Sequence, residues 1–109
     1  MPYDKTLADR VRKSIGGQAG LSEKEMFGGI AFMIRGNVAC GVIGDELLVR
    51  VGPAGNDAAL EQPHARPFDF SGRPSRGWIM LGAGGVAQDA ELKKWVEQGV
   101  AFARTLPAK

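Results

Sequence analysis

Residues 26–51 read MFGGIAFMIRGNVACGVIGDELLVRV, and this stretch decides the fold class. Apolar and β-branched residues fill 26–34, with alternating side chains on opposite faces, and a second apolar run covers 38–43. A third apolar run covers 47–51. The dipeptides Gly36-Asn37 and Gly44-Asp45 separate the runs and are typical of tight hairpin turns. The stretch therefore predicts three antiparallel strands joined as a meander.

Helical patterns flank this meander. Residues 4–15 carry apolar side chains every four positions and predict a helix with Asp4 as its N-cap. Residues 56–60 predict a short helix capped by Asn56 or Asp57. A longer helix is predicted from Asp89, as its cap, to Leu106. Gly99 lies on the apolar side of this last helix, where its missing side chain would admit a close contact with the sheet.

The chain between the last two helices predicts two further strands. Two prolines make 62–67 extended, and 68–70 predicts a short strand. A loop is predicted over 71–77 and a strand over 78–81, before a glycine-rich break. The expected order is α-β-β-β-α-β-β-α. It describes an α+β fold in which an antiparallel five-stranded sheet has helices packed on one side, and residues 1–109 form a single domain.

The composition excludes several classes of protein. The 109 residues are 44% hydrophobic and 24% charged with a net charge of +2, as in a folded domain that can bury its own core. No apolar run is long enough to cross a bilayer, so we expect no membrane association. The single cysteine excludes an internal disulfide. The N-terminus lacks the profile of a signal peptide, and we therefore expect a cytoplasmic protein.

Candidate catalytic groups are few. Cys40 could act as a nucleophile with His64 as its base, but Cys40 lies within an apolar strand, which favours an inert, buried thiol. His64 lies in a proline-flanked loop and more simply braces it. The glycines of 82–85 precede a helix, but they do not complete a GxGxxG motif and predict a structural turn. One Cys and one His cannot form a four-ligand zinc site. We therefore predict no catalytic residue, no metal and no cofactor.

Cations and aromatic residues alternate in the segment before the last strand. Such a mixture can bind phosphates and stack on bases, or it can be an aromatic core strand flanked by solvated arginines. A further arginine interrupts the apolar third strand, where its charge must find an anion or water. The candidate interaction surface comprises Arg50, His64, Arg66, Asp69, Arg73 and Arg76.

Several stretches together resemble a known family, the N-terminal domain of the TfoX/Sxy proteins. The resemblance covers nearly the whole chain and is most specific at the Phe-Gly-Gly strand start and the Gly-Arg-Pro loop. The residues that carry it are Met26 to Met33, Gly36 to Gly41, Leu48 to Val51, Pro67 to Pro74, Gly77-Trp78, and Leu92, Trp95 and Val96.

The resemblance implies an α+β fold and a bacterial regulatory role. Full-length members regulate natural competence and are thought to act with the cyclic-AMP receptor protein at promoters. They carry a second domain, whereas 109 residues fit one. The family supplies no catalytic or ligand residues to carry over. We expect a non-catalytic interaction module that binds a protein partner or itself. The alternatives are a nucleic-acid-binding protein that uses the arginines, or a small enzyme that uses Cys40 or His64.

Overall fold

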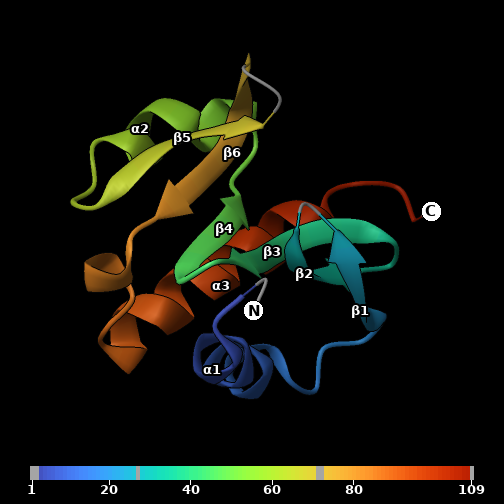
Figure 1. Ribbon diagram of the computed structural model, residues 1–109. Helices are drawn as coiled ribbons and strands as arrows, with labels where there is room; N and C mark the ends of the chain where they lie inside the picture. The colour runs from blue at the N-terminus through green and yellow to red at the C-terminus, as the bar shows by residue number, and fades with distance from the viewer. Residues whose placement is uncertain (1–2, 27, 71–72, 109) are drawn as a thin grey trace.

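The computed structural model describes residues 3–26, 28–70 and 73–108 and shows an α+β fold (Figure 1). One antiparallel sheet holds six strands in the spatial order β1-β2-β3-β4-β6-β5. The predicted five-stranded sheet is therefore wrong by one strand, and the chain order is α-β-β-β-β-α-β-β-α. The elements are α1 (Lys5–Ile15), β1 (Leu21–Met26), β2 (Gly29–Ile34), β3 (Asn37–Ile43), β4 (Glu46–Arg50), α2 (Asn56–Leu60), β5 (Ala65–Phe70), β6 (Arg73–Leu81) and α3 (Asp89–Arg104), with short 3-10 turns at Pro53–Gly55 and Ala83–Gly85.

The additional strand is β1, which was not predicted from the sequence. Its residues are LSEKEM, and the middle four are polar or charged because β1 is an edge strand whose middle four side chains are exposed. The single strand predicted over 26–34 is in fact the end of β1 and the whole of β2, with Met26 paired to Gly29. Gly28 turns the chain between them with a φ of +75°, and Phe27 lies outside the described residues.

The next hairpin turns one residue earlier than predicted. Ile34 pairs with Asn37, so the turn residues are Arg35 and Gly36, which have φ values of +52° and +83°. Two positive φ angles are those of a type I′ turn, which matches the twist of the flanking strands. Asn37 is thereby freed to be buried in β3, where its side-chain amide donates to the carbonyl of Pro107 at 2.9 Å. The predicted turn at Gly44-Asp45 is confirmed by the pairing of Ile43 with Glu46.

The loop predicted over 71–77 is also wrong in part. Strand β6 begins at Arg73, and the pairing of Asp69 with Pro74 extends the β5–β6 hairpin well beyond Trp78. Glycine and proline lower the strand propensity of this segment, but cross-strand pairing outweighs it. The strand predicted over 68–70 is longer for the same reason and begins at Ala65.

The helices agree closely with the sequence. A carboxylate oxygen of Asp4 accepts hydrogen bonds from the backbone N–H groups of Thr6 and Leu7, so the predicted cap of α1 is confirmed. Helix α2 covers its predicted residues, although Gly55 takes the cap position. Helix α3 begins at Asp89, which was expected to be its cap, because Gln88 takes the N-cap position. The helix ends at Arg104, two residues before the expected end. No helix in the described part of the chain is long and apolar enough to cross a membrane.

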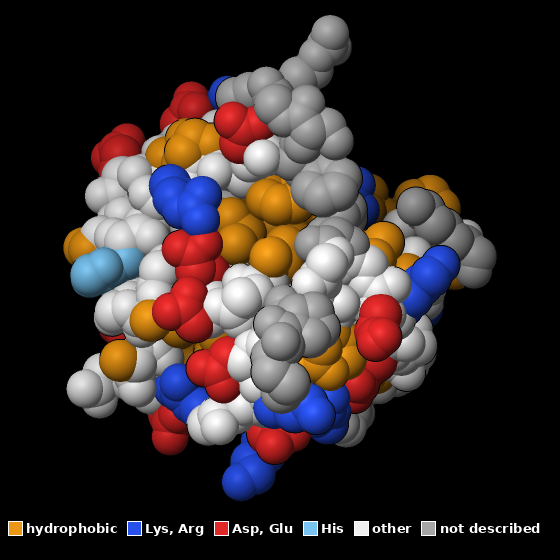
Figure 2. Space-filling model, viewed as in Figure 1, with side chains coloured by type: hydrophobic (Ala, Val, Ile, Leu, Met, Phe, Trp, Pro, Cys, Tyr) orange, Lys and Arg blue, Asp and Glu red, His pale blue; other side chains and the backbone are white. Residues whose placement is uncertain are grey.

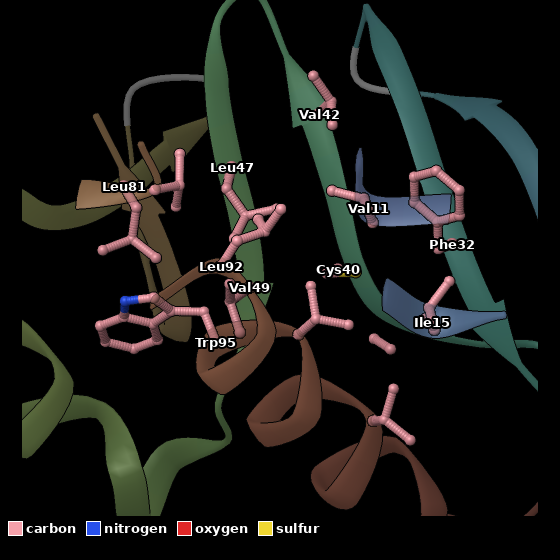
Figure 3. Packing of buried hydrophobic residues seen from close by; sticks show 14 of the residues in the cluster. Val11, Ile15, Phe32, Cys40, Val42, Leu47, Val49, Leu81, Leu92 and Trp95 are labelled. Atoms are coloured by element: carbon pink, nitrogen blue, oxygen red, sulfur yellow. The ribbon is translucent and has the colours of Figure 1, made fainter. Parts of the chain in front are cut away.

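The main core lies between the sheet and the helices (Figure 3). Its buried side chains come from α1, Ala59 of α2, α3, and one face of strands β2, β3, β4 and β6. Gly99 brings α3 onto β3, as expected: a Cβ atom there would lie only 2.2 Å from the carbonyl oxygen of Ala39. The register of β2 and β3 shifts beside Phe32, and Ala39 has no partner across the ladder. The helix layer therefore rests directly on the backbone of β3.

Candidate functional site

The face of the sheet opposite the main core carries a second, smaller apolar cluster. Leu48, Phe68 and Met80 are buried in it, and Ile43 and Trp78 pack against them while half-exposed. None of the described residues in this cluster comes from a helix. We call the surface formed by these five residues and the charged side chains beside them the open face. Figure 2 shows hydrophobic side chains gathered in a hollow over β4 and β6, with charged groups at its border.

The register of the sheet explains why these residues meet. Leu48 pairs with Met80, which pairs in turn with Arg66 of β5, so one row of side chains crosses three strands. Glu46 lies two residues before Leu48 on the same face, and Arg66 forms an ion pair with it. The charge of this predicted site residue is therefore balanced within the chain.

A second predicted arginine is also paired. Arg76 forms an ion pair with Asp57 of α2 at 3.2 Å, and both side chains are exposed. The hydrogen bond from Arg76 lowers the pKa of the Asp57 carboxyl. The pair links the start of α2 to β6, next to the buried hydrogen bond from the Gly77 N–H group to the side-chain oxygen of Asn56 at 2.8 Å.

Arg50 differs from Arg66 and Arg76 because its guanidinium lies against aromatic rings and not beside a carboxylate. It ends β4 opposite Trp78, and its guanidinium carbon lies 4.9 Å from the centre of the Trp78 ring and 5.4 Å from that of Phe102 in α3. Half-burial lowers the pKa of this guanidinium, which is nevertheless charged at neutral pH. In the part of the chain that the structure describes, the side chain of Arg50 makes no hydrogen bond and no ion pair.

The other arginines provide the contrast. Each of the six whose side chains are also described donates at least one hydrogen bond to a carboxylate, a carbonyl or an amide oxygen. They are Arg10, Arg12, Arg35, Arg66, Arg76 and Arg104. Arg50 is thus the one described arginine that is stacked on aromatic rings without an acceptor.

His64 lies apart from the open face. Its backbone has a φ of +68°, and its imidazole packs against the glycines that the sequence placed in a turn. A Cβ atom on Gly84 would lie 2.8 Å from the ring, and one on Gly85 would lie 2.9 Å from the His64 Cβ. Glu91 and Lys94 complete a surface depression of about 340 Å³ around it. Close packing on Gly84 and Gly85 suits a residue that braces the loop, and that role stays a prediction.

Cys40 is buried in the main core (Figure 3). Burial raises the pKa of its thiol to about 12, so almost no thiolate forms at neutral pH. The sheet therefore places the two candidate catalytic residues in different surroundings, one inside the core and one on the surface. Among the described residues no three His, Cys, Asp or Glu side chains gather into a group that could hold a metal ion.

The two remaining predicted residues lie on the β5–β6 hairpin. Asp69 is exposed on β5 and pairs with Pro74. Arg73 starts β6, and its side chain lies outside the described residues. Of the six predicted residues, the structure thus brings Arg50 and Arg66 to one face of the sheet.

Sequence reasoning missed the apolar part of this face. The signal was present, because the consecutive apolar residues 47–49 are typical of a strand buried on both faces. The ring of Phe102 from α3, which completes the surroundings of Arg50, is half-buried beside it. No sequence pattern links residues so far apart.

Comparison with known proteins gives one family. The model of the TfoX N-terminal domain matches residues 13–103, which is most of the chain. No curated protein and no solved structure matches.

Proposed function

The chain belongs to the TfoX N-terminal domain family, and on this premise we propose that it is a non-catalytic regulatory module that works by binding another protein. The observation that carries the proposal is the open face, where half-exposed Ile43 and Trp78 border an apolar cluster whose described members all come from strands. Apolar surface of this kind marks interaction sites on soluble domains. A cytoplasmic location, which was expected from the single cysteine and the N-terminus, belongs to the same proposal, as does the role in transcription that the resemblance implies.

The edges of the sheet are poor alternatives to its face. Edge strand β1 exposes Glu23, Lys24 and Glu25. If two copies paired through β1 about a two-fold axis, a register centred on Lys24 would oppose two Lys24 side chains, and one centred on Glu25 would oppose two Glu25 side chains. Like charges opposite one another destabilise strand pairing. The other edge strand, β5, contains Pro67, which cannot donate to a new ladder.

The state of the two candidate catalytic groups supports a module without chemistry of its own. The thiol of Cys40 is protonated and inaccessible, and His64 packs on Gly84 and Gly85 away from it. Nucleic-acid binding is less well supported, since Arg66 and Arg76 are neutralised by Glu46 and Asp57. Binding to a phosphate backbone requires several cations that can release counterions.

Site-specific photo-crosslinking in the cells from which the sequence comes tests the proposal. A photoreactive phenylalanine replaces Ile43 on the open face or, as a matched control, Ala101, which is exposed on α3. We expect a defined protein adduct from position 43 and none from position 101. The purified adduct protein should then bind the wild-type chain directly and bind Ile43→Asp at least about tenfold more weakly.

Two outcomes would contradict the proposal. One is equal crosslinking from both positions, and the other is a partner whose affinity Ile43→Asp leaves unchanged, with folding of the variant checked by circular dichroism. Fluorescence anisotropy of labelled duplex DNA at two salt concentrations tests the alternative. We expect no binding that falls steeply with salt.

A further inference from the structure

The guanidinium of Arg50, on the open face, has no acceptor for its hydrogen-bond donors among the described residues. This group has five N–H donors. Burial has already removed part of the water that would otherwise hydrate these donors. A partly desolvated cation without an acceptor is unfavourable in isolation and gains from any anion that docks against it.

The surroundings hold this guanidinium in place before any partner arrives. The rings of Trp78 and Phe102 lie 4.9 and 5.4 Å from its central carbon. Gly52 permits the Phe102 ring to lie there, because a Cβ atom on Gly52 would be 2.3 Å from a ring carbon. A stacked, planar guanidinium loses little further side-chain freedom when it binds, and this increases its affinity for an acceptor.

The distribution of charge decides between the possible occupants. In a dimer that buries the open face, Arg50 of one copy would lie against the cationic face of the other copy. Glu46, the acid on this face, is already paired with Arg66 and is not available as its acceptor. A nucleic acid would need a row of available cations, and two of the described arginines near this face, Arg66 and Arg76, are already paired with carboxylates. A carboxylate suits the two-pronged geometry of a single guanidinium, and apolar neighbours suit the cluster beside it.

We propose that Arg50 anchors a protein partner by receiving an aspartate or glutamate side chain, while apolar residues of that partner lie on Trp78 and Ile43. The inference rests on the proposed function of the open face. It also specifies a spacing. Arg50 lies four positions after Glu46, the cross-strand neighbour of Ile43, and four positions span about 13 Å along the strand. An extended partner segment would therefore carry an acidic residue about four positions from an apolar one.

Selection from a random peptide library displayed on phage tests this directly, because the library does not presuppose the partner. Peptides selected on the wild-type chain are synthesised, and their affinities are measured by fluorescence anisotropy. We expect a consensus with an acidic residue next to apolar ones. Affinity should fall about tenfold or more for Arg50→Gln and less for Arg50→Lys, which keeps the charge but not the planar fork. The matched control is Arg76→Gln, which removes an arginine already paired within the chain and should leave affinity within about twofold.

Each other outcome overturns the inference, and the outcomes separate it from the proposed function. Peptides that lose affinity for Ile43→Asp but bind Arg50→Gln normally would keep the open face as a binding surface and remove Arg50 as its anchor. Failure to enrich any peptide would count against both. DNA binding that is lost in Arg50→Gln would assign the arginine to a nucleic acid instead. Circular dichroism and thermal unfolding confirm that Arg50→Gln is folded.

Discussion

Replacing Gly99 with alanine should loosen the helix layer that supports the sheet. The new Cβ atom would lie 2.2 Å from the carbonyl oxygen of Ala39 and 3.3 Å from a methyl carbon of Val49. The first contact is with backbone, so no side-chain rotation relieves it. The helix must then move away from β3 by about 1 Å, a gap that forfeits a quarter to a half of the dispersion energy of each contact it opens.

The magnitude follows from two opposing effects. Alanine favours a helix interior over glycine by about 1 kcal/mol. Overfilling a packed interface costs about 1–3 kcal/mol, and the upper end applies here because the neighbour is a carbonyl group within the sheet. We therefore expect Gly99→Ala to lower the free energy of unfolding by about 2 kcal/mol, which is roughly 10 °C in melting temperature for a domain of this size.

Urea unfolding followed by tryptophan fluorescence measures this change, because Trp95 is buried on α3 and reports on its packing. The matched control is Gly55→Ala. A Cβ atom at Gly55 meets its nearest neighbour at an ordinary 3.6 Å and its φ of −91° suits any residue, so this variant should be neutral or slightly more stable. A Gly99→Ala variant that unfolds at the same urea concentration as the wild type, or at a higher one, would refute the close-packing argument.

Two further predictions follow from titratable groups. Because burial raises the pKa of the Cys40 thiol to about 12, its thiolate fraction at pH 8 should be roughly a thousandfold smaller than in the unfolded chain. A chromogenic disulfide reagent should therefore react quickly with Cys40 only in urea. Fast labelling of the native protein would contradict this prediction. The hydrogen bond from Arg12 lowers the pKa of the Glu23 carboxyl, so the pair stabilises the fold above the unfolded pKa near 4.5 and this stability is lost as the pH falls through the lower folded value. Glu23→Gln should accordingly reduce the free energy of unfolding by about 0.2–1 kcal/mol at pH 7 and by less in acid, and an effect that grows below pH 4.5 would show that the ion pair is not its cause.

The family, the fold class and most of the elements could be predicted from the sequence, because they depend on short-range patterns. The apolar period defines α1, the Asp4 side chain caps it, and the turn at Gly44-Asp45 follows from a glycine with positive φ. Gly99 could also be predicted as a contact point, since a glycine on the apolar side of a helix leaves room for a neighbour.

The errors in the fold arise where pairing between strands outweighs local preference. Strand β1 is charged and reads as a loop, yet it pairs with β2 along its whole length. Residues 73–77 contain proline and glycine, which disfavour a strand. They nevertheless form the first part of β6, because Arg73 and Pro74 pair with β5. At Arg35-Gly36, the identity of the turn residues depended on which residues face each other across the hairpin.

The sequence determined which groups this chain has available, namely an arginine within an apolar strand, a buried cysteine and a single histidine. Only the tertiary structure decided which of them have partners. Arg66 meets Glu46 across 20 positions of sequence, whereas Arg50 meets the rings of Trp78 and Phe102 and finds no acceptor among the described residues. The physical reason is that local patterns reflect the period and turns of the backbone, while charge pairing and burial depend on side chains that the fold brings together from distant parts of the chain.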